Sequence, residues 1–286
     1  MSYILETRDL TQVYGAGTPF ERMALDHVNI GVKKGEILGV IGHTGSGKST
    51  LIQHFNGLLK PTSGEVLLSG HSIWDAKGKC DRKTRFAVGL VFQYPEYQLF
   101  EETIAKDIAF GPQNMGLSAS EIEKRVREAM DFVGLEPALA GHSPFALSGG
   151  QKRRVAIAGV IAMRPQVLIL DEPTAGLDPA GRDEILAQIQ DYHARSGATI
   201  LIVSHSMEDI ARLADRLLVM NQAKVMLCGT PREVFAHADE ITQAGLDIPE
   251  ITKVVRELVR RGFDLDPSIY TVADAVKAIR ACKEGR

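Results

Sequence analysis

A glycine-rich loop between a strand-like and a helix-like segment constrains the fold of this chain most. The loop reads Gly-His-Thr-Gly-Ser-Gly-Lys-Ser-Thr over residues 42–50 and follows an apolar run at 37–41. Leu51, Ile52 and Phe55 come next with helical spacing. Glycines let backbone N–H groups turn toward one point, and a helix N-terminus adds unpaired N–H groups and a positive dipole end. The sequence therefore predicts a strand–loop–helix unit that binds phosphate groups.

Two side chains of this loop have chemical roles in such a unit. We expect Lys48 to reach the β- and γ-phosphates of a nucleotide and Ser49 to place its hydroxyl on Mg²⁺. The alternative is a glycine-rich turn without a ligand. The strand and the helix on either side make that alternative improbable.

Composition describes an ordinary globular protein. The 286 residues are 44% hydrophobic and 24% charged, and the formal net charge of −3 gives no reason to expect a nucleic acid partner. No apolar run approaches the roughly 18 residues that span a bilayer, and the first residues lack the features of a signal peptide. The three cysteines are far apart, which favours reduced thiols over disulfides or a zinc site.

Strand-like and helix-like segments alternate through most of the chain. We predict strands at 4–8, 24–32, 37–41, 65–68, 88–92, 167–170 and 198–203, with a basic surface loop after residue 68. A mostly helical block runs from about 102 to 163 and contains the capping box Ser118-x-x-Glu121. The alternation predicts a three-layered α/β fold with a parallel sheet.

Polar residues follow three of the apolar strands. Gln93 comes after the strand at 88–92, Asp171 and Glu172 after 167–170, and His205 after 198–203. Ligands bind at the carboxyl ends of such strands. Asp171 suits Mg²⁺ and Glu172 suits polarisation of a water nucleophile. A lone histidine is usually structural, but one at this position is also placed to contact a γ-phosphate.

Three further segments have two interpretations each. Ser148 can N-cap a helix whose first residues, Gly149 and Gly150, leave N–H groups bare, so this helix start is either ordinary or a second anion site. The segment 94–103 combines aromatic and acidic residues and is either a solvated loop or a binding edge. Tyr14 is placed in a turn, as an anchor or as a stacking partner for a base.

The last segment of the chain has a different pattern. Residues 248–286 predict two short amphipathic helices. The second is expected to bury Val272, Ala275, Val276 and Ile279. We divide the chain into a large domain at 1–235 and a small helical unit at 236–286.

Together these motifs resemble the nucleotide-binding subunit of an ATP-binding cassette (ABC) transporter, over about residues 3–235. The phosphate loop, Gln93, the signature Leu147–Gln151, Asp171 with Glu172, Asp178 and His205 match in order. The resemblance implies the P-loop NTPase fold: a RecA-like parallel core, N-terminal antiparallel strands and a helical subdomain. It also implies that Tyr14 stacks on adenine. The ATP-binding residues implied are Tyr14, Gly42, His43, Thr44, Gly45, Ser46, Gly47, Lys48, Ser49 and Thr50.

A narrower resemblance lies in residues 92–103, with Ala109-Phe110-Gly111-Pro112. These are similar to the ATPases of energy-coupling-factor (ECF) transporters, and His43-Thr44 looks most like the second of two paralogous ATPases. The resemblance implies import of vitamins, or alternatively of cobalt or nickel, at the cytoplasmic face of the membrane. The implied partners are a second ATPase, a transmembrane coupling subunit and a substrate-binding membrane subunit. The C-terminal helical unit is implied to hold the two ATPases together.

The implied mechanism places ATP between two chains in a head-to-tail pair. Glu172, His205 and Gln93 are the catalytic residues, and Ser49, Gln93 and Asp171 hold Mg²⁺. The partner chain supplies Ser148, Gly149, Gly150, Gln151 and Asp178. The coupling subunit is expected to contact exposed side chains after Gln93, namely Glu96, Leu99, Phe100, Glu101 and Glu102.

Other ABC proteins fit less well. ATPases of DNA repair insert a long coiled coil between phosphate loop and signature, whereas only about 100 residues without sustained heptads separate Ser49 from Ser148 here. Translation-factor relatives carry two cassettes in one chain. A catalytically silent subunit is a third alternative, although Glu172 and His205 are both present. No residue encodes the transported substrate, because a separate subunit of ECF systems binds it.

Overall fold

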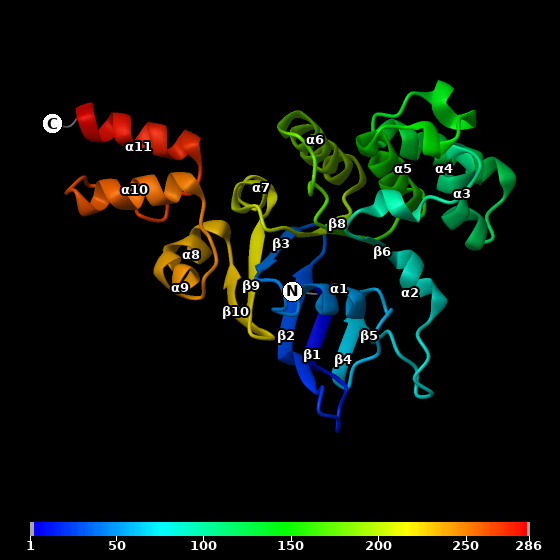
Figure 1. Ribbon diagram of the computed structural model, residues 1–286, viewed down its shortest axis with the longest axis horizontal. Coiled ribbons are helices and arrows are strands. Elements are labelled where there is room, and N and C mark those ends of the chain that lie inside the picture. Colours follow the sequence, from blue (N-terminus) through cyan, green and yellow to red (C-terminus); the bar gives the residue numbers. More distant parts are fainter. Residues whose placement is uncertain (1–2, 285–286) are drawn as a thin grey trace.

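The computed structural model describes residues 3–284 and is built on a mixed six-stranded sheet (Figure 1). The strand order is β10-β9-β3-β8-β7-β6, parallel except for the edge strand β10. The strands are β3 (Ile37–Gly42), β6 (Val88–Val91), β7 (Val167–Asp171), β8 (Thr199–Val203), β9 (Arg216–Asn221) and β10 (Lys224–Gly229). The four strands β3, β6, β7 and β8 are buried along their whole length, as expected for apolar runs covered on both faces.

A second, antiparallel sheet has the order β2-β1-β4-β5. It consists of β1 (Tyr3–Tyr14), β2 (Arg22–Lys33), β4 (Ser63–Leu68) and β5 (His71–Ser72). Helix α1 (Lys48–Phe55) lies between the two sheets, and its Leu51, Ile52 and Phe55 are completely buried in the core that both sheets share. The helix after the phosphate loop is thereby fixed on both sides.

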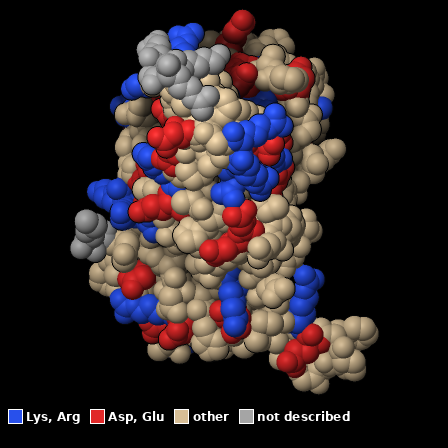
Figure 2. Space-filling model, turned by 90° about the vertical axis from the view of Figure 1, so that its left-hand side faces the viewer, with Lys and Arg blue, Asp and Glu red and all other residues tan. Residues whose placement is uncertain are grey.

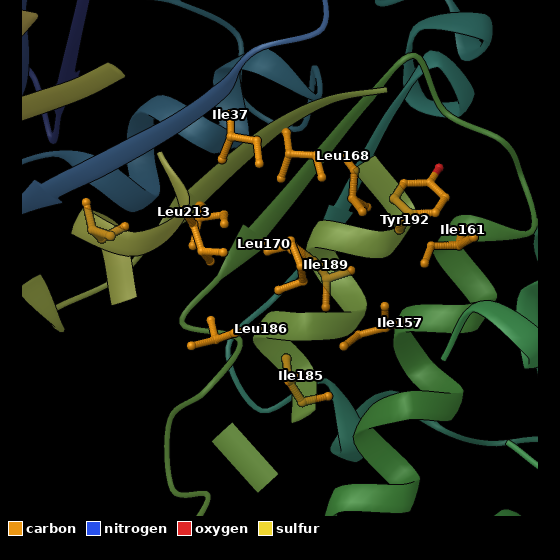
Figure 3. Packing of buried hydrophobic residues seen from close by; sticks show 14 of the residues in the cluster. Ile37, Ile157, Ile161, Leu168, Leu170, Ile185, Leu186, Ile189, Tyr192 and Leu213 are labelled. Atoms are coloured by element: carbon orange, nitrogen blue, oxygen red, sulfur yellow. The ribbon is translucent and has the colours of Figure 1, made fainter. Parts of the chain in front are cut away.

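Helices cover the other face of the mixed sheet. They are α3 (Ile104–Asn114), α4 (Ala119–Phe132), α5 (Gly149–Ile161), α6 (Pro179–Ser196) and α7 (Met207–Leu213), with 3₁₀ turns at Pro95–Gln98, Pro137–Gly141 and Pro144–Ala146. Figure 3 shows Ile185 and Ile189 of α6 packed with Ile157 of α5 and Leu170 of β7. Burial of these apolar faces stabilises each helix against the sheet.

Side-chain caps set where these helices begin. Thr103, Ser118, Ser148, Asp178 and Ser206 each accept a hydrogen bond from the backbone N–H three residues later. The cap at Ser118 forms, but Glu121 binds Arg125 at 2.8 Å instead of returning to the cap as the sequence predicted.

The C-terminal segment contains α8 (Pro231–Ala236), α9 (Ala238–Gln243), α10 (Glu250–Arg260) and α11 (Val272–Glu284). Phe235 and Ile241 belong to the large core, whereas Val255, Leu265 and Ala275 form a small core between α10 and α11. In Figure 1 these last two helices lie at the upper left, away from the sheets. The separate core thus begins near Glu250, later than the expected residue 236.

Several details differ from the sequence prediction. The first strand runs on to Tyr14 through a bulge at Asp9, whose φ is 45°, so Tyr14 ends a strand and does not sit in a turn. The stretch after Leu68 holds β5 and a short helix, α2 (Arg82–Ala87), and the β9–β10 hairpin was missed. Val272 and Val276 are 64% and 43% exposed, so their predicted burial is wrong for this chain alone.

No helix within residues 3–284 has both the length and the apolarity for crossing a bilayer. Figure 2 shows the side of the molecule on the left of Figure 1, where positive and negative side chains are interspersed. No broad field of one sign covers this face.

Candidate functional site

The phosphate loop connects β3 to α1 at the carboxyl edge of the mixed sheet. Gly47 has φ 107°, and a Cβ on it would lie 2.4 Å from the carbonyl oxygen of Ala24 in β2, so only glycine fits here. Lys48 Nζ donates to the carbonyl oxygens of Gly42 at 2.6 Å and His43 at 2.9 Å. Its ammonium therefore lies over the mouth of the loop. Ser46 Oγ is buried without a hydrogen-bond partner within the described residues.

Two carboxylates face the loop from the end of β7. Asp171 and Glu172 are both buried, and Glu172 has a left-handed φ of 50° held by its N–H donation to the Val203 carbonyl. His205 Nε2 lies 3.3 Å from Glu172 Oε1. The register Asp171↔Val203 between β7 and β8 produces this arrangement, because it brings the two strand ends level.

Burial dominates the electrostatics of these groups. It raises the pKa of Asp171 to about 6, aided by the nearby Glu172 charge and opposed by Lys48. Burial also raises the pKa of Glu172 and lowers the pKa values of Lys48 and His205. Several ionisable groups with shifted pKa values in one cavity are typical of functional sites.

A cavity of about 350 Å³ joins these residues. It is lined by most of the residues predicted for ATP, Mg²⁺ and catalysis: Tyr14, Thr44, Gly45, Gly47, Lys48, Ser49, Thr50, Gln93, Asp171, Glu172 and His205. Tyr14 lies at one end, with its hydroxyl 3.5 Å from Thr50 Oγ1. The cavity volume lies within the usual range of ligand-binding pockets.

The signature segment does not line this cavity. Ser148 and Gln151 form a reciprocal capping box at the start of α5, with Gln151 Oε1 accepting from the Ser148 N–H at 3.0 Å. A Cβ on Gly149 or Gly150 would meet nothing within 4 Å, so this helix start is open. Asp178 is likewise absent from the lining and caps α6 by accepting from Gly181 N–H at 2.7 Å.

The segment after Gln93 differs from the prediction in two respects. Glu96 binds Arg153 through both oxygens, at 3.0 and 3.2 Å, and Arg153 is 2% exposed, so Glu96 is already paired within the chain. Leu99, predicted to be exposed, is 8% exposed and belongs to the large core. Arg153 also donates to the carbonyl oxygens of Pro173 and Ala175, directly after the acid pair.

The exposed part of this segment is aromatic. Tyr97 is 85% and Phe100 57% exposed, and Phe100 packs edge-to-face on Phe110 with ring centroids 5.0 Å apart. Glu102 pairs with Lys106 at 2.7 Å, while Glu101 is half-buried. We call the exposed side chains of Tyr97, Phe100 and Phe110 the aromatic patch.

Two arginines of the site were not singled out from the sequence. Arg153 binds Glu96, and the two residues are 57 positions apart in the chain. Arg22 lines the cavity from the start of β2. The hairpin that pairs Arg22 with Tyr14 could have pointed to it, but the strand at 4–8 was predicted too short to reveal the pairing.

A larger cavity of about 480 Å³ lies elsewhere, at the amino ends of β7 and β8. Phe132, Ile161 and Tyr192 line it together with Arg125 and Arg164. It shares no residue with the phosphate loop. The residues predicted for ATP, Mg²⁺ and catalysis therefore line the smaller of these two cavities.

The comparison with known proteins identifies the family. Residues 25–175 match the family described as ABC transporter. This chain belongs to that family. The structure of cbiO1 from Clostridium perfringens, described as part of the ABC transporter complex cbiONQ, aligns with a TM-score of 0.74 at 43% identity, covering 86% of this chain and 96% of that one. The ATP-binding cassette MJ0796 in its dimeric form bound to ADP and Pi aligns with a TM-score of 0.69 at 28% identity, covering 79% of this chain and 98% of that one.

Curated relatives show which type of ABC transporter protein this chain is similar to. The energy-coupling factor transporter ATP-binding protein EcfA2 of Caldanaerobacter subterraneus is 54% identical over 275 residues, and that of Clostridium acetobutylicum is 56% identical over 276 residues. Each alignment covers 96% of both proteins. The predicted α/β fold and the predicted ABC ATPase family are confirmed. The chain is an ATP-binding and ATP-hydrolysing subunit of an energy-coupling-factor transporter.

Proposed function

We propose that ATP binds with its phosphates in the loop at 42–50 and its adenine against Tyr14. The orphaned Ser46 Oγ and a Lys48 ammonium held only by carbonyl oxygens support this, since both gain partners from phosphate oxygens. Ser49, Gln93 and Asp171 supply the hard oxygen ligands that Mg²⁺ prefers. The bound cation supplies positive charge to the phosphate oxygens.

Glu172 is proposed as the catalytic base or water-orienting residue. Its Oε1 is buried and has no hydrogen bond within the described residues, which leaves it available to a water. Its raised pKa increases its basicity once it is ionised. His205, 3.3 Å from that oxygen, is proposed to contact the γ-phosphate and to orient Glu172.

We further propose that two ATPase chains pair head to tail around ATP. The observation that carries this proposal is that one cavity unites the phosphate loop, Glu172 and His205 but excludes Ser148 and Asp178. The open Gly149–Gly150 helix start presents N–H groups that suit the γ-phosphate of ATP bound to a partner. Val254, Val272 and Val276 are exposed on the C-terminal helices and provide apolar surface for the same pairing.

The proposed membrane partner is a transmembrane coupling subunit, with a separate membrane subunit that binds the substrate. The aromatic patch supports this, because exposed aromatic clusters mark interfaces. Glu101 is the remaining acid for a basic coupling helix, since Glu96 and Glu102 are paired internally. We propose peripheral attachment at the cytoplasmic face and vitamin uptake. Import of cobalt or nickel is the alternative, supported by likeness to cbiO1.

Pairing can be tested in the Glu172→Gln background, where ATP is expected to persist between the chains. The complex is purified and its subunit composition is measured by light scattering with and without ATP. Adding Ser148→Arg should abolish the ATP-dependent association. Ser118→Arg is the matched control, because it removes an equivalent helix cap on α4. Association that survives Ser148→Arg would contradict the head-to-tail arrangement.

A further inference from the structure

Arg22 stands in an unusual place for an exposed arginine. It opens β2 directly opposite Tyr14 at the end of β1, so the two side chains share one face of the antiparallel sheet. Both line the cavity of the phosphate loop. The residue proposed to stack on adenine therefore has a guanidinium as its cross-strand neighbour.

The guanidinium lies directly against the phosphate loop. A Cβ built on Gly45 would be 2.7 Å from Arg22 Nη2, and the φ of 82° at Gly45 favours glycine at this position. Arg22 thus bridges the gap between Tyr14 and the loop. It approaches the loop at Gly45, while the Lys48 ammonium is held by the carbonyls of Gly42 and His43.

The charge of Arg22 is unpaired within the part of the chain that the structure describes. Within residues 3–284 its side chain makes no ion pair or hydrogen bond. Arginines elsewhere in the core domain, such as Arg153 and Arg216, bind carboxylates. A solvated surface arginine would also lack partners, but it would not lie in a phosphate-binding cavity against a loop glycine.

We propose that Arg22 binds the α- and β-phosphate oxygens of the nucleotide. The loop N–H groups cradle these two phosphates, and Gly45 is part of that cradle. A planar guanidinium fork can donate two parallel hydrogen bonds to phosphate oxygens, which a lysine cannot reproduce. Arg22 then contributes to affinity for ATP and ADP alike. This inference rests on the proposed nucleotide site.

The test is titration of the purified full-length chain with ATP and with ADP in the presence of Mg²⁺. For Arg22→Ala we expect affinity for both nucleotides to fall roughly tenfold, the scale of a lost charge-assisted hydrogen bond. Arg22→Lys should recover only part of the loss. Lys33→Ala at the other end of β2 is the matched control and should bind normally. Thermal unfolding without nucleotide should not change, because Arg22 makes no ion pair or hydrogen bond among the described residues.

Three outcomes would overturn the inference. If Arg22→Ala lost affinity for ATP alone, the guanidinium would contact the γ-phosphate. If it lost affinity for neither nucleotide, the guanidinium would lie in solvent. If Arg22→Lys bound both nucleotides as tightly as wild type, the two parallel hydrogen bonds of the guanidinium would have no role. Lys48→Ala, measured alongside, separates this inference from the site itself. If Lys48→Ala binds normally, the nucleotide site is wrong; if it loses binding while Arg22→Ala does not, only the role of Arg22 is wrong.

Discussion

At the scale of single residues, Glu172 combines burial, a left-handed backbone and an oxygen without a hydrogen bond. Glu172→Gln keeps the shape of the side chain and removes its basicity. We expect steady ATP turnover of the assembled complex to fall at least about a hundredfold, the usual range for a lost general base. Nucleotide binding should persist, because Lys48 and the loop are untouched. Turnover is measured by phosphate release, with the exposed Glu123→Gln on α4 as control. Turnover near wild type would refute the role of Glu172.

His54 makes stability depend on pH. It is completely buried in α1 between the sheets, and burial lowers its pKa to about 4. Below about pH 6.5 His54 becomes protonated in the unfolded chain, whereas in the folded chain it stays neutral. The free energy of unfolding should therefore fall by about 1.4 kcal/mol for each pH unit between pH 6.5 and 4 from this group.

The measurement is urea unfolding at pH 7.5 and 5.5. Wild type should lose about 1.4 kcal/mol more than His54→Gln over this interval. His71→Gln, which removes an exposed histidine, should keep the full slope. If wild type and His54→Gln lost the same stability over this pH interval, His54 would be protonated as readily in the folded chain as in the unfolded chain.

At the scale of elements, the α9–α10 connection contacts the phosphate loop. His43 Nε2 is 2.8 Å from the carbonyl oxygen of Ala244, and a Cβ on Gly245 would lie 3.0 Å from that nitrogen. The carbonyl of the same His43 accepts from Lys48. A side chain on Gly245 therefore pushes on a residue that positions the loop.

Gly245→Ala should lower nucleotide affinity several-fold, in addition to costing about 1 kcal/mol of stability for the left-handed backbone. Gly262→Ala is the matched control, because Gly262 has φ 89° and a Cβ there would meet nothing within 4 Å. Both variants should lose similar stability in urea unfolding. Only Gly245→Ala should weaken nucleotide binding in a titration, and equal affinities would contradict the contact.

At the scale of the whole molecule, the aromatic patch is the surface proposed to meet the membrane subunit. Tyr97→Ala combined with Phe100→Ala should weaken association with the coupling subunit at least tenfold, because large aromatic side chains dominate such interfaces. ATP binding by the chain should remain. Association is measured by co-purification from membranes and function by transport. Phe20→Ala removes an aromatic side chain that is 86% exposed on a distant turn and should have no effect. Normal transport by the double variant would exclude this surface.

Local sequence patterns were sufficient to predict the chemistry of the phosphate site and the fold class. Contiguous motifs specified the phosphate loop, and apolar runs with polar ends placed Gln93, Asp171, Glu172 and His205 at strand ends, because strand period and helix spacing are local properties. The sequence also predicted two amphipathic helices within residues 248–286. Contacts between separate segments became known only from the folded chain. The register between β7 and β8 places Glu172 beside His205, and Arg153 forms an ion pair with Glu96. Leu99 is buried in the large core. The bulge at Asp9 lets β1 continue to Tyr14, which pairs with Arg22. Apart from the Tyr14–Arg22 hairpin pair, these contacts join residues far apart in the chain, and no local pattern encodes them.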